Sequence, residues 1–172
     1  MKKKARRKKA KRRYRRKPQN ILNPVPEVAK YSDQILGGLM LCIDPSSGSR
    51  GSMPGYAYFQ AGELIESGII EVNPNQKPHI RLAEIGAILR DREQFPEPDV
   101  LILEEIKSIR GKFKPPMSLL WACGVIASSF SCPLIEVAPK LWTKIRDDAY
   151  EKSDEEDARY IGKYVIGLAK AS

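Results

Sequence analysis

Three apolar runs of strand length, separated by segments of helical periodicity, constrain the fold of this chain more than any other feature. The runs are LMLCID from Leu39, DVLILEE from Asp99 and PLIEVAP from Pro133. Each is short and nearly continuous in apolar residues, which is typical of a strand buried on both faces. A sheet buried on both faces needs helices on both sides, so the sequence predicts an α/β layered domain.

The segments between these runs supply the remaining elements. GYAYFQ and LIESGIIEV flank a turn at Gly62 and predict an antiparallel hairpin after the first strand. Helical spacing predicts an amphipathic helix over 79–95 and an apolar helix over 117–130, and further helices are expected from about Lys140 and from Ser153. The predicted fold is therefore a mixed five-stranded sheet flanked by helices.

The positive charge of the chain is concentrated at its start. Of the 30 Lys and Arg residues, 13 lie in residues 1–17, which contain no acid, so the other 17 are outnumbered by the 21 acidic residues. Self-repulsion and the lack of apolar residues predict a disordered basic tail over 1–17, suited to binding nucleic acid through its phosphates. Residues 18–38, with three prolines and two closing glycines, are expected to be a linker, and 39–172 the single folded domain.

Several classes of protein are disfavoured by the composition. The cysteines Cys42, Cys123 and Cys132 form no CxxC pair and His79 is the only histidine, so a zinc site is not expected and the thiols are expected to be buried and reduced. The longest apolar run has 12 residues, whereas a membrane span takes about 20. No apolar stretch follows the basic start, as a secretory signal would require. We expect a soluble cytoplasmic protein.

Two carboxylates stand where the predicted strands end. Asp44 follows LMLCI and Glu104 follows LIL. Functional sites of open α/β sheets lie beyond the carboxyl ends of the strands. Carboxylates on adjacent strand ends supply the oxygen ligands that Mg²⁺ prefers, so these residues are candidate metal ligands.

A second pair of acids begins the last predicted helix. Asp154 and Asp157 are three residues apart and share one helix face. One interpretation is purely structural, because Ser153 and Glu156 form a capping-box pattern and acids are favoured at any helix start. The other is functional, because a strand-end Asp, a strand-end Glu and helix-start acids together are what a two-metal carboxylate site needs.

Three motifs in this order resemble the RuvC family of Holliday junction resolvases. IDP with GYAYF resembles the opening strand and hairpin of the family, LILEEI its central Glu strand, and DEEDARYIGKYVI its closing DxxDA helix, over about residues 39–170. The resemblance implies a ribonuclease H-like fold in which Asp44, Glu104, Asp154 and Asp157 are the catalytic, metal-binding residues. Glu105 is the rival of Glu104, and only one of them can face the metals, because neighbouring strand residues point to opposite faces.

The same resemblance implies a function. The chain would be a structure-selective DNA endonuclease that works as a homodimer and resolves Holliday junctions or other branched DNA. It would act in recombination and repair, in a bacterial cell or a phage-infected host. Two Mg²⁺ ions about 3.5–4 Å apart, which Mn²⁺ replaces, would be bridged by Asp44. Two alternatives stay open: a non-catalytic nucleic-acid-binding protein with a ribonuclease H-like domain, and a related nuclease acting on RNA or flaps.

The chain departs from the family pattern in a short stretch between the last strand and the DxxD helix, and at two further places. The loop after Asp44 is longer than usual and has Ser46 where the family has glycine, and Lys107 replaces an aromatic residue three positions after the Glu. These departures bear on how junction DNA is recognised.

Further residues carry weaker signals. A basic segment follows the Glu104 strand and either contacts a phosphate backbone or is a solvated loop; its residues are Lys107, Arg110, Lys112 and Lys114. Trp121 and Trp142 lie among apolar residues at helical positions, so we expect core packing rather than base stacking.

Overall fold

The computed structural model describes residues 26–48, 52–106 and 115–172, and it contains the predicted five-stranded sheet. The strands run in the order β3-β2-β1-β4-β5 across the sheet. β2 is antiparallel to both of its neighbours, β3 and β1, whereas β1, β4 and β5 are parallel to one another. The strands are β1 (Leu39–Asp44), β2 (Gly55–Gln60), β3 (Glu63–Ile69), β4 (Val100–Glu104) and β5 (Leu134–Val137).

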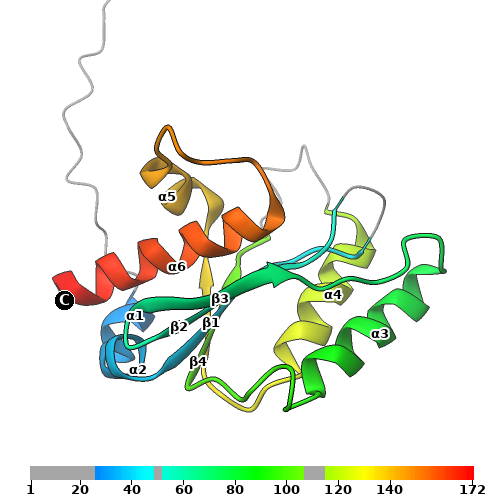
Figure 1. Cartoon of the computed structure of the whole chain (residues 1–172), viewed down its shortest axis with the longest axis horizontal. Helices are drawn as coiled ribbons and strands as arrows, with labels where there is room; N and C mark the ends of the chain where they lie inside the picture. Colours follow the sequence, from blue (N-terminus) through cyan, green and yellow to red (C-terminus); the bar gives the residue numbers. More distant parts are fainter. Residues whose placement is uncertain (1–25, 49–51, 107–114) are drawn as a thin grey trace, which may run out of the picture.

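Helices cover both faces of the sheet (Figure 1). One face carries α3 (Pro78–Arg90) and α4 (Met117–Ala127), and the other carries the long α6 (Asp154–Ala171). The short α5 (Pro139–Trp142) runs into a 3₁₀ turn (Thr143–Ile145) before α6. Helix α3 ends before the predicted position because the carboxylate of Asp91 accepts a hydrogen bond from the backbone of Glu93, at 3.1 Å, and so favours a turn.

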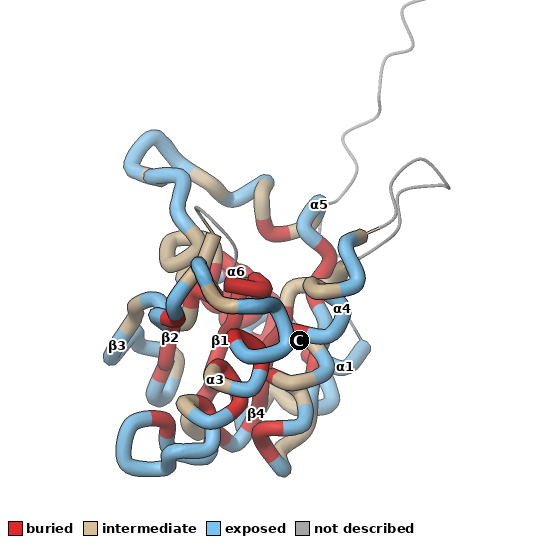
Figure 2. The backbone as a smooth tube through the Cα atoms, turned by 90° about the vertical axis from the view of Figure 1, so that its right-hand side faces the viewer, coloured by how far each residue is buried: buried red, intermediate tan, exposed pale blue. Residues whose placement is uncertain are grey.

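Strand β1 shows how alternating side chains build two cores. Met40 and Cys42 face the α6 side, whereas Leu41 and Ile43 face α3 and α4, and all four are fully buried. The central strands are accordingly buried along most of their length, as Figure 2 shows. The sheet is thus buried on both faces, as the continuous apolar runs predict.

The expected linker over 18–38 is wrong in its second half. Residues Pro26–Lys30 form α1 and Ser32–Gly37 form α2, and both helices contact α6. Val28 and Ile35 are fully buried in the same core as the α6 side chains. Pro26 starts α1, a position that tolerates proline because the first backbone N–H groups of a helix lack partners. The folded domain therefore includes these two helices, and the tail over 1–17 lies outside the described residues.

The two tryptophans have different environments. Trp142 is 1% exposed, which confirms core packing, but Trp121 is 54% exposed, so the core prediction is wrong there. Helix α4 packs inward through Ala122 and Ile126, and its opposite side presents Met117, Leu120 and Trp121 to solvent. In the described part of the chain no helix has both the length and the apolar character to cross a membrane.

The three thiols are free, as expected. Cys42 is buried as expected, whereas Cys123 and Cys132 are only half-buried. Burial raises the pKa of all three, to about 11 for Cys123 and Cys132, so the protonated thiol is favoured at neutral pH. These residues therefore contribute to packing, and metal binding or nucleophilic attack is disfavoured.

Candidate active site

The parallel register of β1 and β4 brings Asp44 and Glu104 together. Ile43 pairs with Leu103, so the next residues of the two strands are neighbours at the same sheet edge. Asp44 has the same parity as Cys42, and Glu104 the same parity as Ile102, which both face α6. Glu105 has the opposite parity. Glu104, not Glu105, therefore shares the site with Asp44.

Both carboxyl groups favour protonation in this position. Asp44 is 9% exposed, and burial raises its pKa to about 10, with further contributions from a hydrogen bond and charge at Glu104 and from the charges of Asp157 and Asp154. Burial also raises the pKa of Glu104, against the effect of hydrogen bonds from Asp44 and Trp142. Two negative charges so close together in a buried setting are unfavourable unless a proton or a cation compensates them.

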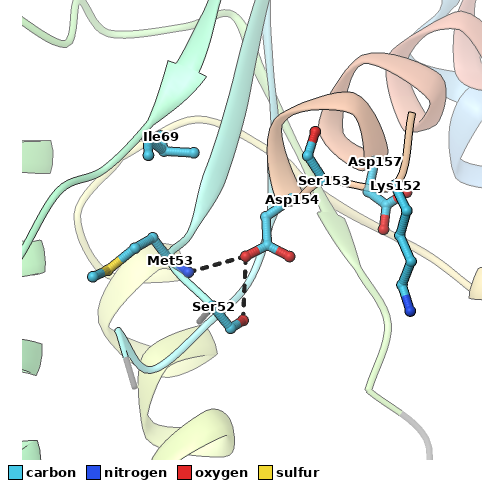
Figure 3. Close-up of a pocket in the computed structure, with 7 residues that line it drawn as sticks. All are labelled: Ser52, Met53, Ile69, Lys152, Ser153, Asp154 and Asp157. Carbon is cyan, nitrogen blue, oxygen red and sulfur yellow. Dashed lines mark hydrogen bonds between the residues drawn. The ribbon is translucent and has the colours of Figure 1, made fainter. Parts of the chain in front are cut away.

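Asp154 ties the start of α6 to the beginning of β2. One of its carboxylate oxygens, Oδ2, accepts hydrogen bonds from the backbone N–H of Met53, at 2.9 Å, and from the hydroxyl of Ser52, at 3.2 Å (Figure 3). Gly55 lies against the same helical turn: a Cβ there would be 1.9 Å from the backbone oxygen of Asp154. The sheet and the helix therefore contact each other where the acids are.

The structural interpretation of the helix-start acids is confirmed in part. The hydroxyl of Ser153 accepts a hydrogen bond from the backbone N–H of Glu156 at 3.1 Å, as in a capping box. The charges of Asp154 and Asp157 nevertheless raise the pKa of Asp44, so these acids also belong to the carboxylate cluster. Capping and membership of the cluster coexist. We call Asp44, Glu104, Asp154 and Asp157 the carboxylate cluster below.

Asp157 binds two residues that the sequence interpretation missed. Its Oδ1 accepts a hydrogen bond from Arg146, at 2.7 Å, and one from the hydroxyl of Tyr150, at 2.5 Å. The guanidinium of Arg146 lies over the rings of Trp142 and Tyr150, 4.5 and 4.1 Å from their centroids. Trp142 in turn donates from Nε1 to Glu104 at 3.2 Å. An arginine and two aromatics just before an acidic helix start were the available signal.

The loop after Asp44 is held closed by its own polar groups. The hydroxyl of Ser46 bonds the backbone oxygen and the hydroxyl of Ser52, at 2.8 and 2.9 Å. Gly48 adopts a φ of +65°, so the glycine that the loop conformation needs lies two residues beyond Ser46. The buried Arg81 of α3 donates to the backbone oxygen of Ser47 at 3.1 Å. The substitution at Ser46 is thus part of a closed loop beside the cluster.

A cavity of about 450 Å³ opens beside the two helix-start acids. Figure 3 shows the side chains around it. It is lined by Ser52, Met53, Ile69, Lys152, Ser153, Asp154 and Asp157. Space next to the carboxylates is what a reacting group would need. The predicted phosphate contacts Lys107, Arg110, Lys112 and Lys114 lie outside the described residues.

The chemistry of the donor set fits a hard divalent cation. All four side chains offer carboxylate oxygens, the ligand type of Mg²⁺ and Ca²⁺, and a cation would compensate the negative charge of the buried Asp44 when its carboxyl group is ionised. Within the described residues no three acidic, histidine or cysteine side chains already stand in coordinating positions. Asp154 and Asp157 instead bond groups within the chain, so both must turn toward Asp44 to share a cation with it.

The sheet order and the two helical layers give a mixed five-stranded α/β fold whose structural neighbours are RuvC-like, ribonuclease H-like folds. Thermus thermophilus RuvC in complex with a Holliday junction substrate superposes with a TM-score of 0.56 and 16% identity, over 77% of this chain and 94% of that one. The yeast mitochondrial Holliday junction resolvase superposes with a TM-score of 0.53 and 11% identity, over 82% of this chain and 85% of that one. Neither a protein-family model nor a curated protein matches the sequence.

Proposed function

We propose that this protein is a divalent-metal-dependent endonuclease that cuts Holliday junctions or other branched DNA. The observation that carries the proposal is the convergence of Asp44 and Glu104 on the face that α6 covers, with Asp154 and Asp157 close enough to affect the pKa of Asp44. The similarity of the fold to two resolvases, one of them in complex with a Holliday junction substrate, also supports the proposal.

The chain's own residues would do most of the positioning. Asp44 and Glu104, fixed on adjacent strands, would hold the metal ligands without flexible stems. Asp154 and Asp157 would complete the set from the rigid first turn of α6. When bound, Mg²⁺ would lower the pKa of an attacking water and stabilise the leaving oxygen, so that no histidine is needed as a base. Water addition to phosphorus and cleavage of the P–O3′ bond would leave 5′ phosphate and 3′ hydroxyl ends.

We also propose that the working unit is a homodimer formed through α4. A junction has two strands to cut, and two copies related by a twofold axis would cut them symmetrically. The outward side of α4 supports this with Met117, Leu120 and Trp121, spaced as neighbours on one helix face and all exposed in the single chain.

The test is cleavage of a labelled four-way junction in Mg²⁺ by the full chain and by Asp44→Asn. We expect the substitution to abolish cleavage while leaving the protein folded and its junction affinity equal or higher, because it removes a metal ligand and a charge that repels phosphate. Glu105→Gln is the matched control and should keep most activity, because Glu105 has the opposite strand parity. Full activity of Asp44→Asn would disprove the proposal.

The substrate is settled by comparing four labelled nucleic acids. A four-way junction, a flap, duplex DNA and an RNA–DNA hybrid would be incubated with the full chain in Mg²⁺ and in Mn²⁺. Preference for the junction supports the resolvase function, and preference for the flap or the hybrid would replace it with another nuclease activity. Binding of all four without Mg²⁺-dependent cleavage would indicate a nucleic-acid-binding protein.

A further inference from the structure

Arg146 stands apart from the other basic side chains of the described residues. It makes the one ion pair there that involves the carboxylate cluster, with 2.7 Å between its terminal nitrogen and Oδ1 of Asp157. Two further ion pairs among the described residues, Arg92 with Glu97 and Arg159 with Glu156, lie outside the cluster. Arg146 also favours the charged form of Glu104, so its charge acts on two members of the cluster.

Two aromatic rings lie against the guanidinium of Arg146. Its guanidinium lies over Trp142 and Tyr150, and its Nε is buried without a hydrogen-bond partner. A guanidinium is planar and weakly hydrated, so stacking of this kind stabilises it whatever its N–H edge binds. The side chain is 30% exposed and therefore reaches solvent. Arg146 can thus exchange the partner of its edge without leaving the rings.

Asp157 is the partner of Arg146 for which a divalent cation would compete. Both of its hydrogen bonds, from Arg146 and from Tyr150, use the same oxygen. A divalent cation shared with Asp44 would place a second positive charge at that carboxylate, and two cations on one carboxylate repel each other. The Arg146 pair is partly exposed, and such pairs contribute little free energy, so it is the weaker of the two competitors.

We propose that Arg146 is an exchangeable counter-ion of the carboxylate cluster: it pairs with Asp157 until the carboxylates bind a divalent cation, and its guanidinium then binds a phosphate of the DNA. This inference rests on the proposed function. A freed guanidinium has five donors and no acceptor, and its fork matches two phosphate oxygens. Metal binding and DNA binding are therefore coupled through one side chain, which acts as a positioning residue in the first step and as a phosphate ligand in the second.

The first experiment measures Ca²⁺ binding to the full chain by calorimetry without DNA. Arg146→Gln should bind Ca²⁺ about fivefold more tightly than the unchanged protein, because a competitor of roughly surface-pair strength has been removed. Arg159→Gln is the matched control: Arg159 is similarly exposed and makes a similar ion pair on α6 outside the cluster, so its affinity should not change. Equal or weaker Ca²⁺ binding by Arg146→Gln would overturn the proposal.

The second experiment measures affinity for a four-way junction by fluorescence anisotropy, in Ca²⁺ and in EDTA, with a gel to confirm that the DNA stays intact. Addition of Ca²⁺ should increase the affinity of the unchanged protein at least threefold more than that of Arg146→Gln. The Arg159→Gln control should show the full increase. The same increase in all three proteins would mean that Arg146 does not reach DNA, and the proposal would fail.

A measurement on the unchanged protein keeps the proposal testable if Arg146→Gln does not fold. The ¹⁵N resonance of the Arg146 side chain, assigned by its loss in Arg146→Lys, should move when Ca²⁺ is added, and a fixed resonance would contradict the exchange. Asp44→Asn separates the two hypotheses. If Asp44→Asn binds Ca²⁺ as well as the unchanged protein does, both the proposed function and the exchange are disproved. If Ca²⁺ binding depends on Asp44 but is not changed by Arg146→Gln, only the exchange is disproved.

Discussion

At the scale of single residues, the site is a group of carboxyl groups that lie close together, among them the buried Asp44. Asp44 is buried by the strands on either side of it, yet it lies within reach of three other acids. Such a placement costs folding free energy and is retained where function needs it. Its consequence can be measured as a dependence of stability on pH.

The pKa of Asp44 is raised from 3.8 to about 10 on folding, so between these pH values the folded chain binds more protons than the unfolded one. Stability from this group is therefore fully present below about pH 4 and is lost as pH rises toward 10. We predict that, in EDTA, the free energy of unfolding of the unchanged protein falls more steeply between pH 5 and pH 9 than that of Asp44→Asn.

Urea denaturation at pH 5, 7 and 9 measures this difference. Asp91→Asn, which changes an exposed carboxylate at the end of α3, should keep the slope of the unchanged protein. Addition of Mg²⁺ should flatten the slope of the unchanged protein and not that of Asp44→Asn. If the free energy of unfolding changed with pH by the same amount in all three proteins, ionisation of Asp44 would not destabilise the fold. The cluster would then need no cation.

Whether a residue of the site could be identified from the sequence depends on whether it lies in a regular element. Asp44 and Glu104 follow apolar runs of strand length, so their place at strand ends was predictable. These runs are continuous, so the sequence did not tell whether Glu104 or Glu105 lies on the side of Asp44, and the register of β1 and β4 decides this. Arg146 and Tyr150 lie in an irregular segment, where no periodicity tells which way a side chain points. Their contacts with Asp157 depend on how that segment packs over α6, and only the tertiary structure specifies this.

At the scale of elements, the position of α6 relative to the sheet decides whether the acids converge. Helix α6 packs on β2 and β1 by way of close approaches at glycine: a Cβ at Gly162 would lie 2.2 Å from the ring of Phe59, and one at Gly55 would meet the first turn of α6. The glycines are visible in the sequence, but the partner of each is not. The same holds for α1 and α2: the prolines and closing glycines of residues 18–38 suggested a linker, and the core contacts that fold these two helices are made with α6.

We predict that Gly55→Ala displaces the start of α6 from the sheet. The added methyl group would overlap the backbone of Asp154, and such overpacking costs about 1–3 kcal/mol of stability. Because Asp154 and Asp157 move with that turn, Ca²⁺ affinity should fall as well. Urea denaturation and calorimetry measure the two effects.

Gly167→Ala is the control for this change. Gly167 is exposed in the same helix and has no atom within 4 Å of an added Cβ, so alanine there should increase stability by about 0.5–1 kcal/mol and leave Ca²⁺ binding unchanged. A Gly55→Ala protein with the stability and Ca²⁺ affinity of the unchanged chain would show that the contact between β2 and α6 does not set the site.

At the scale of the whole molecule, two surfaces extend beyond the single domain: the outward side of α4 and the basic segment at the start of the chain. For the first, we predict that Trp121→Glu prevents dimer formation, because it places a charge at the centre of the proposed interface. Light scattering at micromolar concentration measures the mass. Ile65→Glu on β3 changes an equally exposed apolar residue and should leave a dimer intact. A monomeric unchanged protein, with and without junction DNA, would exclude symmetric cutting.

The basic segment 1–17 is predicted to supply affinity without specificity. Its 13 Lys and Arg residues would release counterions from DNA, and if they contact about six phosphates, removing them should reduce the slope of log K against log salt by about five units. Replacing the 13 residues by Gln keeps the length and isolates the charge. Because the first described helix begins at Pro26, nine residues after this segment, the variant should retain the stability and Ca²⁺ affinity of the unchanged protein. Its preference for a junction over duplex DNA should also persist, since phosphate contacts do not distinguish the two. An unchanged salt slope would mean that the segment does not bind DNA, and a lost junction preference would mean that it takes part in recognition.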